Sequence, residues 1–496
     1  MTTHTSPVRA TPLDVDTFRA AGHRLVDRLA DLLADIDHRA LFPPRVEPAE
    51  LHALFDEPVP DEGRPLDGLI DDLEQRLLPY CTHVNHPGYF GLITPSPLPA
   101  GVLADFVASA LNQNPGAWSI GPAAVAMEQR VIRWLTDLVG YDATAGGHLT
   151  SGGMMANFTA LKLARDWASG DRTQYEGVRE RATVYTSDER HISVDKSVDC
   201  AGIGRDNLRV IASDEDYRLD LAALERAIAQ DRRTGARPAC LVAMGGSTNN
   251  GAVDDLPALR AIADRERMWL HVDAAYGGGL LLSDAHRAAL RGIELADSVT
   301  IDPHKWFFAP LDAGAILVRD ASRLTRSFGL QPAYLTDQLD PMQERFNFYV
   351  HSFEQSRRFR GLKVWMGLRH TGAAQVAAWI DANVAHARRL YELASAHPDF
   401  LPATWPTMSA ICIRYAPAGH PPDALDALHP VVARRIEAGG DYWISTTELK
   451  GRTWFRICPV NFRTRPEHIE GLFETLVREC RLATDAPPRR APAPAG

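Results

Sequence analysis

Two ionisable residues follow closely on short apolar stretches of the chain. Asp273 comes directly after residues 269–272, and Lys305 comes four residues after the stretch 298–301. If both stretches are parallel strands, the two side chains emerge at the carboxyl edge of one sheet, where open α/β folds bind ligands. Aromatic residues follow Lys305, and poor solvation of an ammonium group there favours the free amine that Schiff-base chemistry requires. A turn-forming aspartate and a surface lysine are the ordinary alternatives.

Two more segments carry groups that suit a phosphorylated ring. Gly152, Gly153 and Met154 precede a helical pattern, and the free N–H groups at a helix start attract anions. The segment matches neither GxxxxGK nor GxGxxG, so nucleotide-triphosphate and dinucleotide sites lose support. His191 follows the apolar stretch 182–186, and a histidine there can stack on a flat cofactor or move a proton.

One ligand uses all four features, and it is pyridoxal 5′-phosphate (PLP). Its phosphate needs the helix start and its aldehyde needs an amine. Its pyridine nitrogen needs a carboxylate, which keeps the ring protonated and makes it an electron sink. We therefore expect PLP to bind where Lys305, Asp273 and His191 meet.

The elements that position these residues follow from the pattern of apolar stretches. Strands are expected at six places that alternate with helical patterns: 182–186, 208–212, 240–243, 269–272, 298–301 and 315–318. This alternation predicts an α/β fold with a mostly parallel, doubly wound sheet. After residue 362, long helical patterns and strand candidates at 409–415 and 453–458 indicate a smaller α+β domain. An amphipathic helix near residues 18–36 must bury its apolar stripe on this subunit or on a partner.

Composition excludes several classes of protein. The 496 residues carry 53 basic and 63 acidic side chains, a net charge of −10, without the basic footprint of a nucleic-acid binder. No apolar run approaches the roughly 18 residues that span a membrane, and the start lacks the apolar core of a secretory signal. The six cysteines form no CxxC pair, so we expect neither zinc nor disulfides, and a cytoplasmic location.

Five segments together resemble one family of enzymes. TSGGMMAN, YTSDERHIS, HVDAAYGG, DPHKW and SRRFRGLKVW resemble, in order and spacing, the group II PLP-dependent amino-acid decarboxylases, which include the aromatic-L-amino-acid, glutamate and histidine decarboxylases. The resemblance implies fold type I of the PLP enzymes, with a seven-stranded type of sheet, and an obligate homodimer. It also implies an N-terminal dimer-wrapping segment (1–95), a large PLP-binding domain (96–378), a small C-terminal domain (379–482) and a disordered tail (483–496).

The resemblance also assigns the catalytic roles. Lys305 would hold PLP as the internal aldimine, and Asp273 would pair with the pyridine nitrogen. His191 and Ala275 would pack on the two faces of the ring. Tyr334 matches the tyrosine of a mobile loop that helps to protonate the carbanion after carbon dioxide leaves. The implied reaction converts an L-amino acid to its amine through an external aldimine and a quinonoid.

The remaining cofactor contacts come from four residues. His304 and Thr248 would line the PLP site, and the backbone N–H groups of Gly153 and Met154 would bind the phosphate. Many relatives carry a small hydroxyl residue where this chain has Met154. A thioether cannot donate a hydrogen bond, so we expect weaker PLP binding here.

The substrate and the product are less defined by the sequence. Neither Tyr89-Phe90 nor Trp118 decides the substrate, and we expect an L-amino acid with an aromatic or other apolar side chain. An aldehyde synthase, which consumes oxygen after decarboxylation, is the first alternative, although Tyr334 and His191 favour a simple decarboxylase. A non-catalytic amino-acid-binding scaffold and an aminotransferase are further alternatives. A metal site built on histidines such as His271 has no matching ligand motif.

Overall fold

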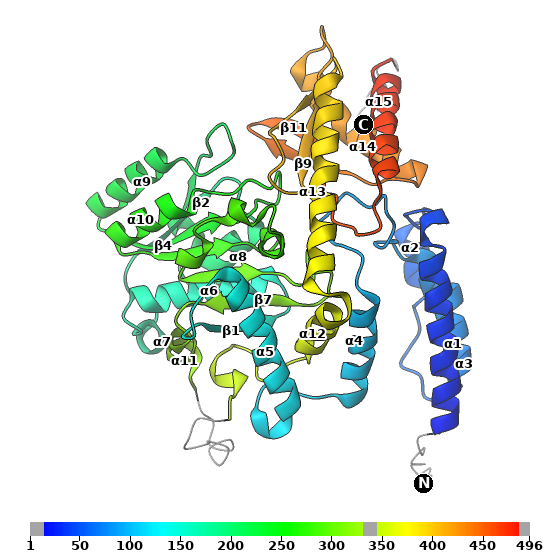
Figure 1. Cartoon of the computed structure of the whole chain (residues 1–496), viewed down its shortest axis with the longest axis horizontal. Helices are drawn as coiled ribbons and strands as arrows, with labels where there is room; N and C mark the ends of the chain where they lie inside the picture. The colour runs from blue at the N-terminus through cyan, green and yellow to red at the C-terminus, as the bar shows by residue number, and fades with distance from the viewer. Residues whose placement is uncertain (1–13, 331–344, 486–496) are drawn as a thin grey trace, which may run out of the picture.

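The large domain is built on a seven-stranded sheet. The computed structural model describes residues 14–330 and 345–485 (Figure 1). The sheet has the strand order β1-β7-β6-β5-β4-β2-β3, in which β7 is antiparallel to both neighbours and the other pairs are parallel. Its strands are β1 (Gly146–Thr150), β2 (Ala182–Ser187), β3 (Leu208–Ile211), β4 (Arg237–Met244), β5 (Trp269–Asp273), β6 (Ser298–Ile301) and β7 (Gly314–Val318).

The mostly parallel sheet confirms the predicted fold class. All six strands predicted for this domain are present, and their ends differ from the prediction by at most three residues. The sequence analysis missed β1, because the segment Gly146-Gly147-His148 carries no apolar run. The glycines are needed there: a Cβ on Gly147 would lie 2.0 Å from the carbonyl oxygen of Ile316 in the neighbouring strand.

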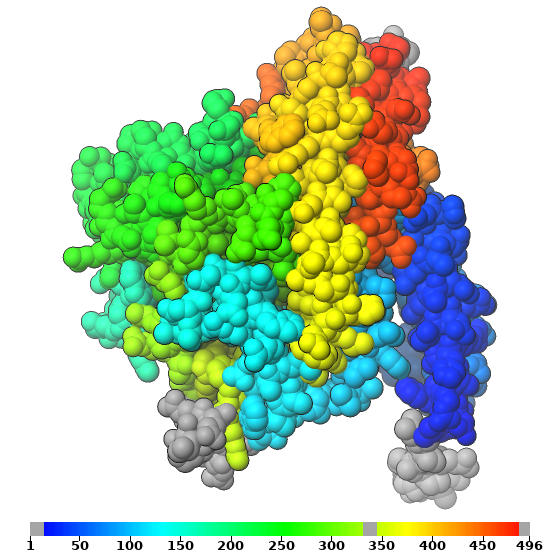
Figure 2. Space-filling model, in the orientation of Figure 1, coloured from blue at the N-terminus to red at the C-terminus, as the bar shows by residue number. Residues whose placement is uncertain are grey.

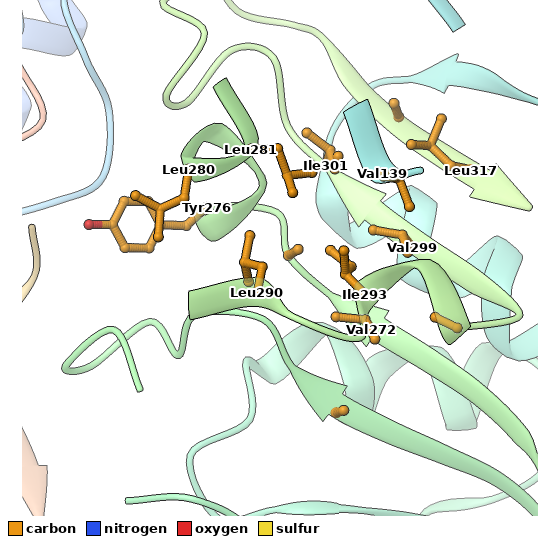
Figure 3. Close-up of a cluster of buried hydrophobic side chains, with 14 of the residues drawn as sticks. Val139, Val272, Tyr276, Leu280, Leu281, Leu290, Ile293, Val299, Ile301 and Leu317 are labelled. Atoms are coloured by element: carbon orange, nitrogen blue, oxygen red, sulfur yellow. The ribbon is translucent and has the colours of Figure 1, made fainter. Parts of the chain in front are cut away.

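Helices cover both faces of this sheet. One face packs against α5 (Pro122–Val139), α9 (Leu221–Arg233) and α10 (Leu256–Glu266), and Figure 3 shows part of that core. The other face packs against α6 (Gly153–Ala168), α8 (Ile192–Cys200) and α11 (Ser322–Phe328). Neighbouring residues of a strand enter opposite cores, as Val184 and Tyr185 do, because side chains alternate across a strand. A short helix, α7 (Thr173–Glu176), follows α6.

A second, antiparallel sheet forms the small domain. Its order is β10-β11-β9-β8, with the strands β8 (Phe400–Pro402), β9 (Ile411–Tyr415), β10 (Ser445–Leu449) and β11 (Arg452–Ile457). The strand candidates at 409–415 and 453–458 correspond to β9 and β11. The helices α14 (Pro422–Gly439) and α15 (Pro466–Asp485) pack here, and α12 (Arg360–Thr371) leads to the long helix α13 (Ala373–Ala396), which joins the two domains (Figure 1).

The N-terminal helices lie at the side of the molecule. They are α1 (Val15–Ala34), α2 (Pro48–Ala53), α3 (Leu66–Asp72) and α4 (Pro99–Leu111). Figure 2 shows α1 at the margin, and Ala21 is its one buried residue. The predicted domain boundaries stay a prediction, and the end of the tail, 486–496, lies outside the described residues. No helix within the described ranges is long and apolar enough to cross a membrane.

A fully buried ion pair joins the segment before α12 to the sheet. Arg357 donates to Glu128 of α5 and, over 3.0 Å, to the carbonyl oxygen of Leu149 in β1. Both charged side chains are 0% exposed. Burial raises the pKa of the Glu128 carboxyl group, and the Arg357 guanidinium opposes that shift. The Arg357–Glu128 pair therefore connects the segment before α12, α5 and β1, and loss of either residue would leave the other as a buried, unpaired charge.

We predict that Arg357→Met lowers the free energy of unfolding by about 3–5 kcal/mol, because it leaves Glu128 buried without its cation. The measurement is urea denaturation followed by circular dichroism. Arg358→Met is the matched control: the Arg358 side chain is half exposed, and its contact with Asp105 is worth less than about 1 kcal/mol. Equal effects of the two substitutions would contradict the anchoring role.

Candidate active site

Loops at the carboxyl edge of the large sheet carry the predicted site residues. Asp273 is the last residue of β5, and Lys305 lies in the turn after β6. His191 is the N-cap of α8, just after β2. Thr248 lies in the loop after β4, and Gly153 is the first residue of α6, after β1. The predicted residues thus come from five strand–loop junctions of one sheet.

Lys305 faces a carboxylate. Its Nζ lies 3.2 Å from Oδ2 of Asp302, which is buried, and Nε2 of His304 lies 3.5 Å from the same oxygen. The aromatic residue that follows, Trp306, is buried and donates from Nε1 to Asn383 over 3.0 Å. The amine of Lys305 therefore meets a specific acidic partner, where the sequence analysis expected an apolar setting. Burial lowers the pKa of His304, and Asp302 opposes that shift.

Asp273 is buried and accepts hydrogen bonds at both carboxylate oxygens. The backbone N–H of Ala275 donates to Oδ1 over 3.1 Å, and Nδ2 of Asn157 donates to Oδ2 over 2.7 Å. Asn157 also donates to Oγ of Ser193 over 2.8 Å. An ionised carboxylate is an acceptor only, so these donors suit a charged Asp273.

His191 lies among the charges of this site. Nδ1 of His191 accepts from the backbone N–H of Ser193 over 3.2 Å, so the ring is held at the start of α8. Burial lowers the pKa of His191, and the charge of Asp273 opposes this while that of Lys305 adds to it. At neutral pH the ring is therefore uncharged, and it can lie flat against an aromatic surface without the cost of burying a cation.

The start of α6 forms an anion cradle. Its N-cap, Gly152, has φ = +155° and provides no capping side chain. Helix geometry leaves the N–H groups of Gly153 and Met154 without partners inside the helix. A Cβ on Gly153 would lie 2.8 Å from Oδ2 of Asp302 and 3.1 Å from the Ala275 side chain. The cradle therefore lies beside Asp302, the partner of Lys305, and beside Ala275, whose N–H donates to Asp273. The Met154 side chain is exposed.

Thr248 lies where the small domain touches the site. Its carbonyl oxygen accepts from Nε of Arg456 in β11 over 2.8 Å, and Nη1 of Arg456 donates to the carbonyl oxygen of Gly91 over 3.0 Å. Nη2 of Arg456 is buried and has no hydrogen-bond partner among the described residues. The charge of Arg456 acts on His191, so this guanidinium belongs to the site.

Tyr334 lies outside the described residues, so its predicted role stays a prediction. Within the ranges 14–330 and 345–485, no three or more His, Cys, Asp and Glu side chains are grouped to hold a metal ion.

Sequence reasoning missed several residues of this site. Asn157 was part of a quoted motif but had no role, and Arg456 comes from a different domain, where no local pattern marks it. His271 had a usable signal, because it precedes Asp273 by two residues and therefore shares its face of β5. The sequence analysis considered His271 only as a metal ligand.

Comparison with known proteins decides the family. The model of the "pyridoxal-dependent decarboxylase conserved domain" matches residues 48–416. The chain belongs to the pyridoxal-dependent decarboxylases. An aromatic-L-amino-acid decarboxylase of Bacillus atrophaeus is 33% identical over 458 residues, covering 92% of this chain and 94% of that protein. A phenylacetaldehyde synthase of Arabidopsis thaliana is 29% identical, covering 94% and 96%. The crystal structure of Oryza sativa TDC with PLP and tryptamine has a TM-score of 0.89 at 28% identity, covering 95% of this chain and 99% of that one.

The protein is thus a PLP-dependent carboxy-lyase, and its site fits the cofactor. The start of α6 has no side chain capping it, so its N–H groups can receive a phosphate. The Asp273 carboxylate could serve as the acceptor and the Lys305 amine as the nucleophile that PLP needs. A side chain at Gly153 would collide with Asp302 and Ala275, so only glycine leaves space there.

We predict that Met154→Ser strengthens PLP binding by about 10-fold or more, because the new hydroxyl can donate to the phosphate. The measurement is the dissociation constant of PLP for apoenzyme, from fluorescence quenching. Met154→Leu is the matched control, which keeps the size of the side chain and adds no donor. Unchanged affinity in Met154→Ser would place the phosphate away from residue 154.

Proposed function

We propose that this decarboxylase converts an L-amino acid with an aromatic or other apolar side chain to its amine and carbon dioxide. The observation that carries the proposal is the arrangement at the sheet edge. Gly153 at the start of α6 lies beside Asp302, which pairs with the Lys305 amine, and beside Ala275, whose N–H donates to the Asp273 carboxylate. The Lys305 amine, the Asp273 carboxylate and the start of α6 are the three anchors that the aldehyde, ring nitrogen and phosphate of one PLP molecule require.

Bound PLP supplies an electron sink for the electron pair left when carbon dioxide departs. In our proposal Lys305 would hold the cofactor covalently until a substrate amine replaces it, and Asp302, 3.2 Å away, would pair with the lysine when it is an ammonium ion. Uncharged His191 would pack on one face of the ring and Ala275 on the other. The unpaired Nη2 of Arg456 offers a donor to a substrate carboxylate.

Three further site residues have proposed roles. His304 accepts from the backbone N–H of Ala313 at Nδ1, over 3.0 Å, which directs Nε2 towards Asp302 and the lysine. Thr248 would line the cofactor side of its loop, and Tyr334 would supply the proton that replaces the lost carboxylate.

Relatives support the class of substrate. The protein from Bacillus atrophaeus is named for aromatic L-amino acids, and the Oryza sativa structure contains tryptamine, an aromatic amine. The phenylacetaldehyde synthase keeps aldehyde formation as the alternative product. Tyr334 favours the amine, because the proposed proton donor removes the carbanion before oxygen can react with it.

We also propose a homodimer that forms over α1 and α4. These helices touch through Phe18 and Phe106, whose rings stack with centroids 6.5 Å apart. Both leave large apolar side chains exposed: Val15, Phe18 and Val26 on α1, and Val102, Leu103, Phe106, Val107 and Leu111 on α4. Contiguous exposed apolar surface of this kind marks an interaction site. The proposed dimer-wrapping segment 1–95 contains α1.

A cytoplasmic location and the predicted domain boundaries complete the proposal. All six cysteines are free thiols, as expected for a reducing compartment. The boundaries near 95, 378 and 482 leave the seven-stranded sheet in one unit and the four-stranded sheet in another.

A panel of L-amino acids, incubated with holoenzyme under air, tests this function. We expect an aromatic or apolar amino acid to yield equal amounts of carbon dioxide and amine without oxygen uptake. Aldehyde with oxygen uptake would replace the decarboxylase proposal by the aldehyde synthase. Lys305→Ala is the control variant: it should lose both turnover and the visible absorbance of lysine-bound PLP, and a retained band would refute the role of Lys305.

We predict that Phe106→Asp converts the dimer to monomers, because it places a charge in the apolar surface of α4. The measurement is size-exclusion chromatography with light scattering. Leu482→Asp is the control: Leu482 is an exposed residue of α15 in the small domain, and the variant should stay dimeric. A dimeric Phe106→Asp protein would move the interface elsewhere.

A further inference from the structure

Asn157 lies at the centre of a buried hydrogen-bond network. Its side chain is 1% exposed and uses both ends of the amide. Nδ2 donates to Asp273 over 2.7 Å and to Ser193 over 2.8 Å. Oδ1 accepts from the Thr300 hydroxyl over 2.7 Å and lies 3.0 Å from Nε2 of His271. One side chain of α6 thus connects β5, β6 and α8.

The direction of every bond in this network follows from the charge of Asp273. An ionised carboxylate accepts only, so the NH₂ end of Asn157 must face it. Oδ1 of Asn157 then faces His271, and Nε2 of His271 must carry the hydrogen. With the hydrogen on Nε2, the other ring nitrogen, Nδ1, accepts from the Ser298 hydroxyl over 2.9 Å and does not donate to the Ser298 carbonyl oxygen 3.2 Å away. The Ser298 hydroxyl oxygen in turn accepts from Nε1 of Trp269 over 2.8 Å.

The network therefore runs in one direction, from Trp269 through Ser298, His271 and Asn157 to Asp273. Aligned hydrogen bonds in a low-dielectric interior polarise one another. Burial lowers the pKa of His271 to about 4, so its ring stays neutral and brings no positive charge beside the carboxylate. A proton on Asp273 would weaken the bond from Asn157, because a neutral carboxyl group is a poorer acceptor than a carboxylate.

We propose that Asn157 is a positioning residue that keeps Asp273 free of a proton, so that the proton stays on the cofactor's ring nitrogen. The proposal rests on the proposed function of Asp273 as the partner of that nitrogen. Asn157 itself does not touch the reacting atoms, and it acts by donating to the Asp273 oxygen. The backbone N–H of Ala275 donates to the other oxygen of Asp273. Among the described residues, Asn157 is the side chain that donates to this carboxylate.

Two substitutions of Asn157 test whether its Nδ2 donor, rather than the volume of its side chain, is what Asp273 requires. Asn157→Leu keeps approximately the volume and removes both donor and acceptor. Asn157→Asp keeps an acceptor for Thr300 and His271 but replaces the donor by a second acid. Two adjacent carboxyl groups share one proton rather than both ionise, so in this variant Asp273 carries part of that proton and is a weaker partner for the ring nitrogen.

The experiment reconstitutes each protein with PLP labelled with nitrogen-15 in the ring and records its chemical shift by solid-state NMR. We expect a protonated ring in the parent enzyme and a shift towards the unprotonated form in both Asn157 variants. We also expect kcat to fall about 10- to 100-fold, the loss typical of one hydrogen bond to a charged group. KM should change much less, because the substrate does not contact Asn157.

Asn383→Leu is the matched control for a purely structural effect. Asn383 is equally buried, accepts from Trp306 over 3.0 Å and donates to the carbonyl oxygen of Asn461 over 3.1 Å. Its replacement should reduce stability and leave the ring signal at the parent position. A parent-like ring signal in PLP-loaded Asn157→Leu, or in Asn157→Asp if the leucine variant does not fold, overturns the proposal.

Asp273→Asn distinguishes a failure of the proposed role of Asp273 from a failure of the proposed role of Asn157. If this variant retains the protonated-ring signal, Asp273 is not the partner of the nitrogen, and its proposed function falls together with the role of Asn157. If Asp273→Asn loses the signal while the Asn157 variants keep it, Asp273 stands and only the inference about Asn157 is wrong.

Discussion

The burial of the Asp273 carboxylate is the constraint on which the arrangement of this active site depends. A charge taken out of water must be met by donors, or it costs several kcal/mol. One donor, the N–H of Ala275, comes from the next turn of the chain, and the other comes from Asn157. Because Asn157 lies four residues after Gly153 on α6, one helical turn of about 5.4 Å separates the anion cradle from the residue that holds the carboxylate. A single rigid element thus sets the spacing between the two ends of the cofactor site.

The small domain contacts the loops of the proposed site through side-chain hydrogen bonds. Arg456 reaches from β11 to the carbonyl oxygens of Thr248 and Gly91. A second link runs from Glu189, near His191, through Asn249 to Thr447 of β10, with hydrogen bonds of 3.0 and 2.8 Å. Burial raises the pKa of Glu189 to about 7. The loops that carry His191 and Thr248 are therefore fastened to both domains, so a rotation of the small domain would disturb both.

The fold and the ionisable residues could be predicted from the sequence because their signals are local. Apolar stretches mark the strands, and Asp273, His191 and Lys305 stand at or just beyond strand ends. The strands β1, β8 and β10 escaped prediction. Glycine and polar residues form β1 and β10, and β8 has only three residues, so pairing with neighbouring strands decides the structure of all three. Asn157 and Arg456 could not be found in this way, because their partners lie far away in the sequence. The apolar surroundings expected for Lys305 were wrong in one respect. The carboxylate of Asp302, three residues earlier in the chain, lies 3.2 Å from the lysine amine.

The pairing of β1 has a consequence for the order in which the protein matures. β1 pairs with β7 alone, with Gly146 opposite Val318, so its partner is synthesised after the intervening strands and helices. Contacts between such distant segments form slowly, since a long loop must close first. A nascent chain that has not yet emerged beyond residue 318 has Lys305 in place but leaves β1 without its partner strand. The edge of the sheet that precedes the start of α6 is therefore completed only after β7, the last strand of the large sheet, has been synthesised.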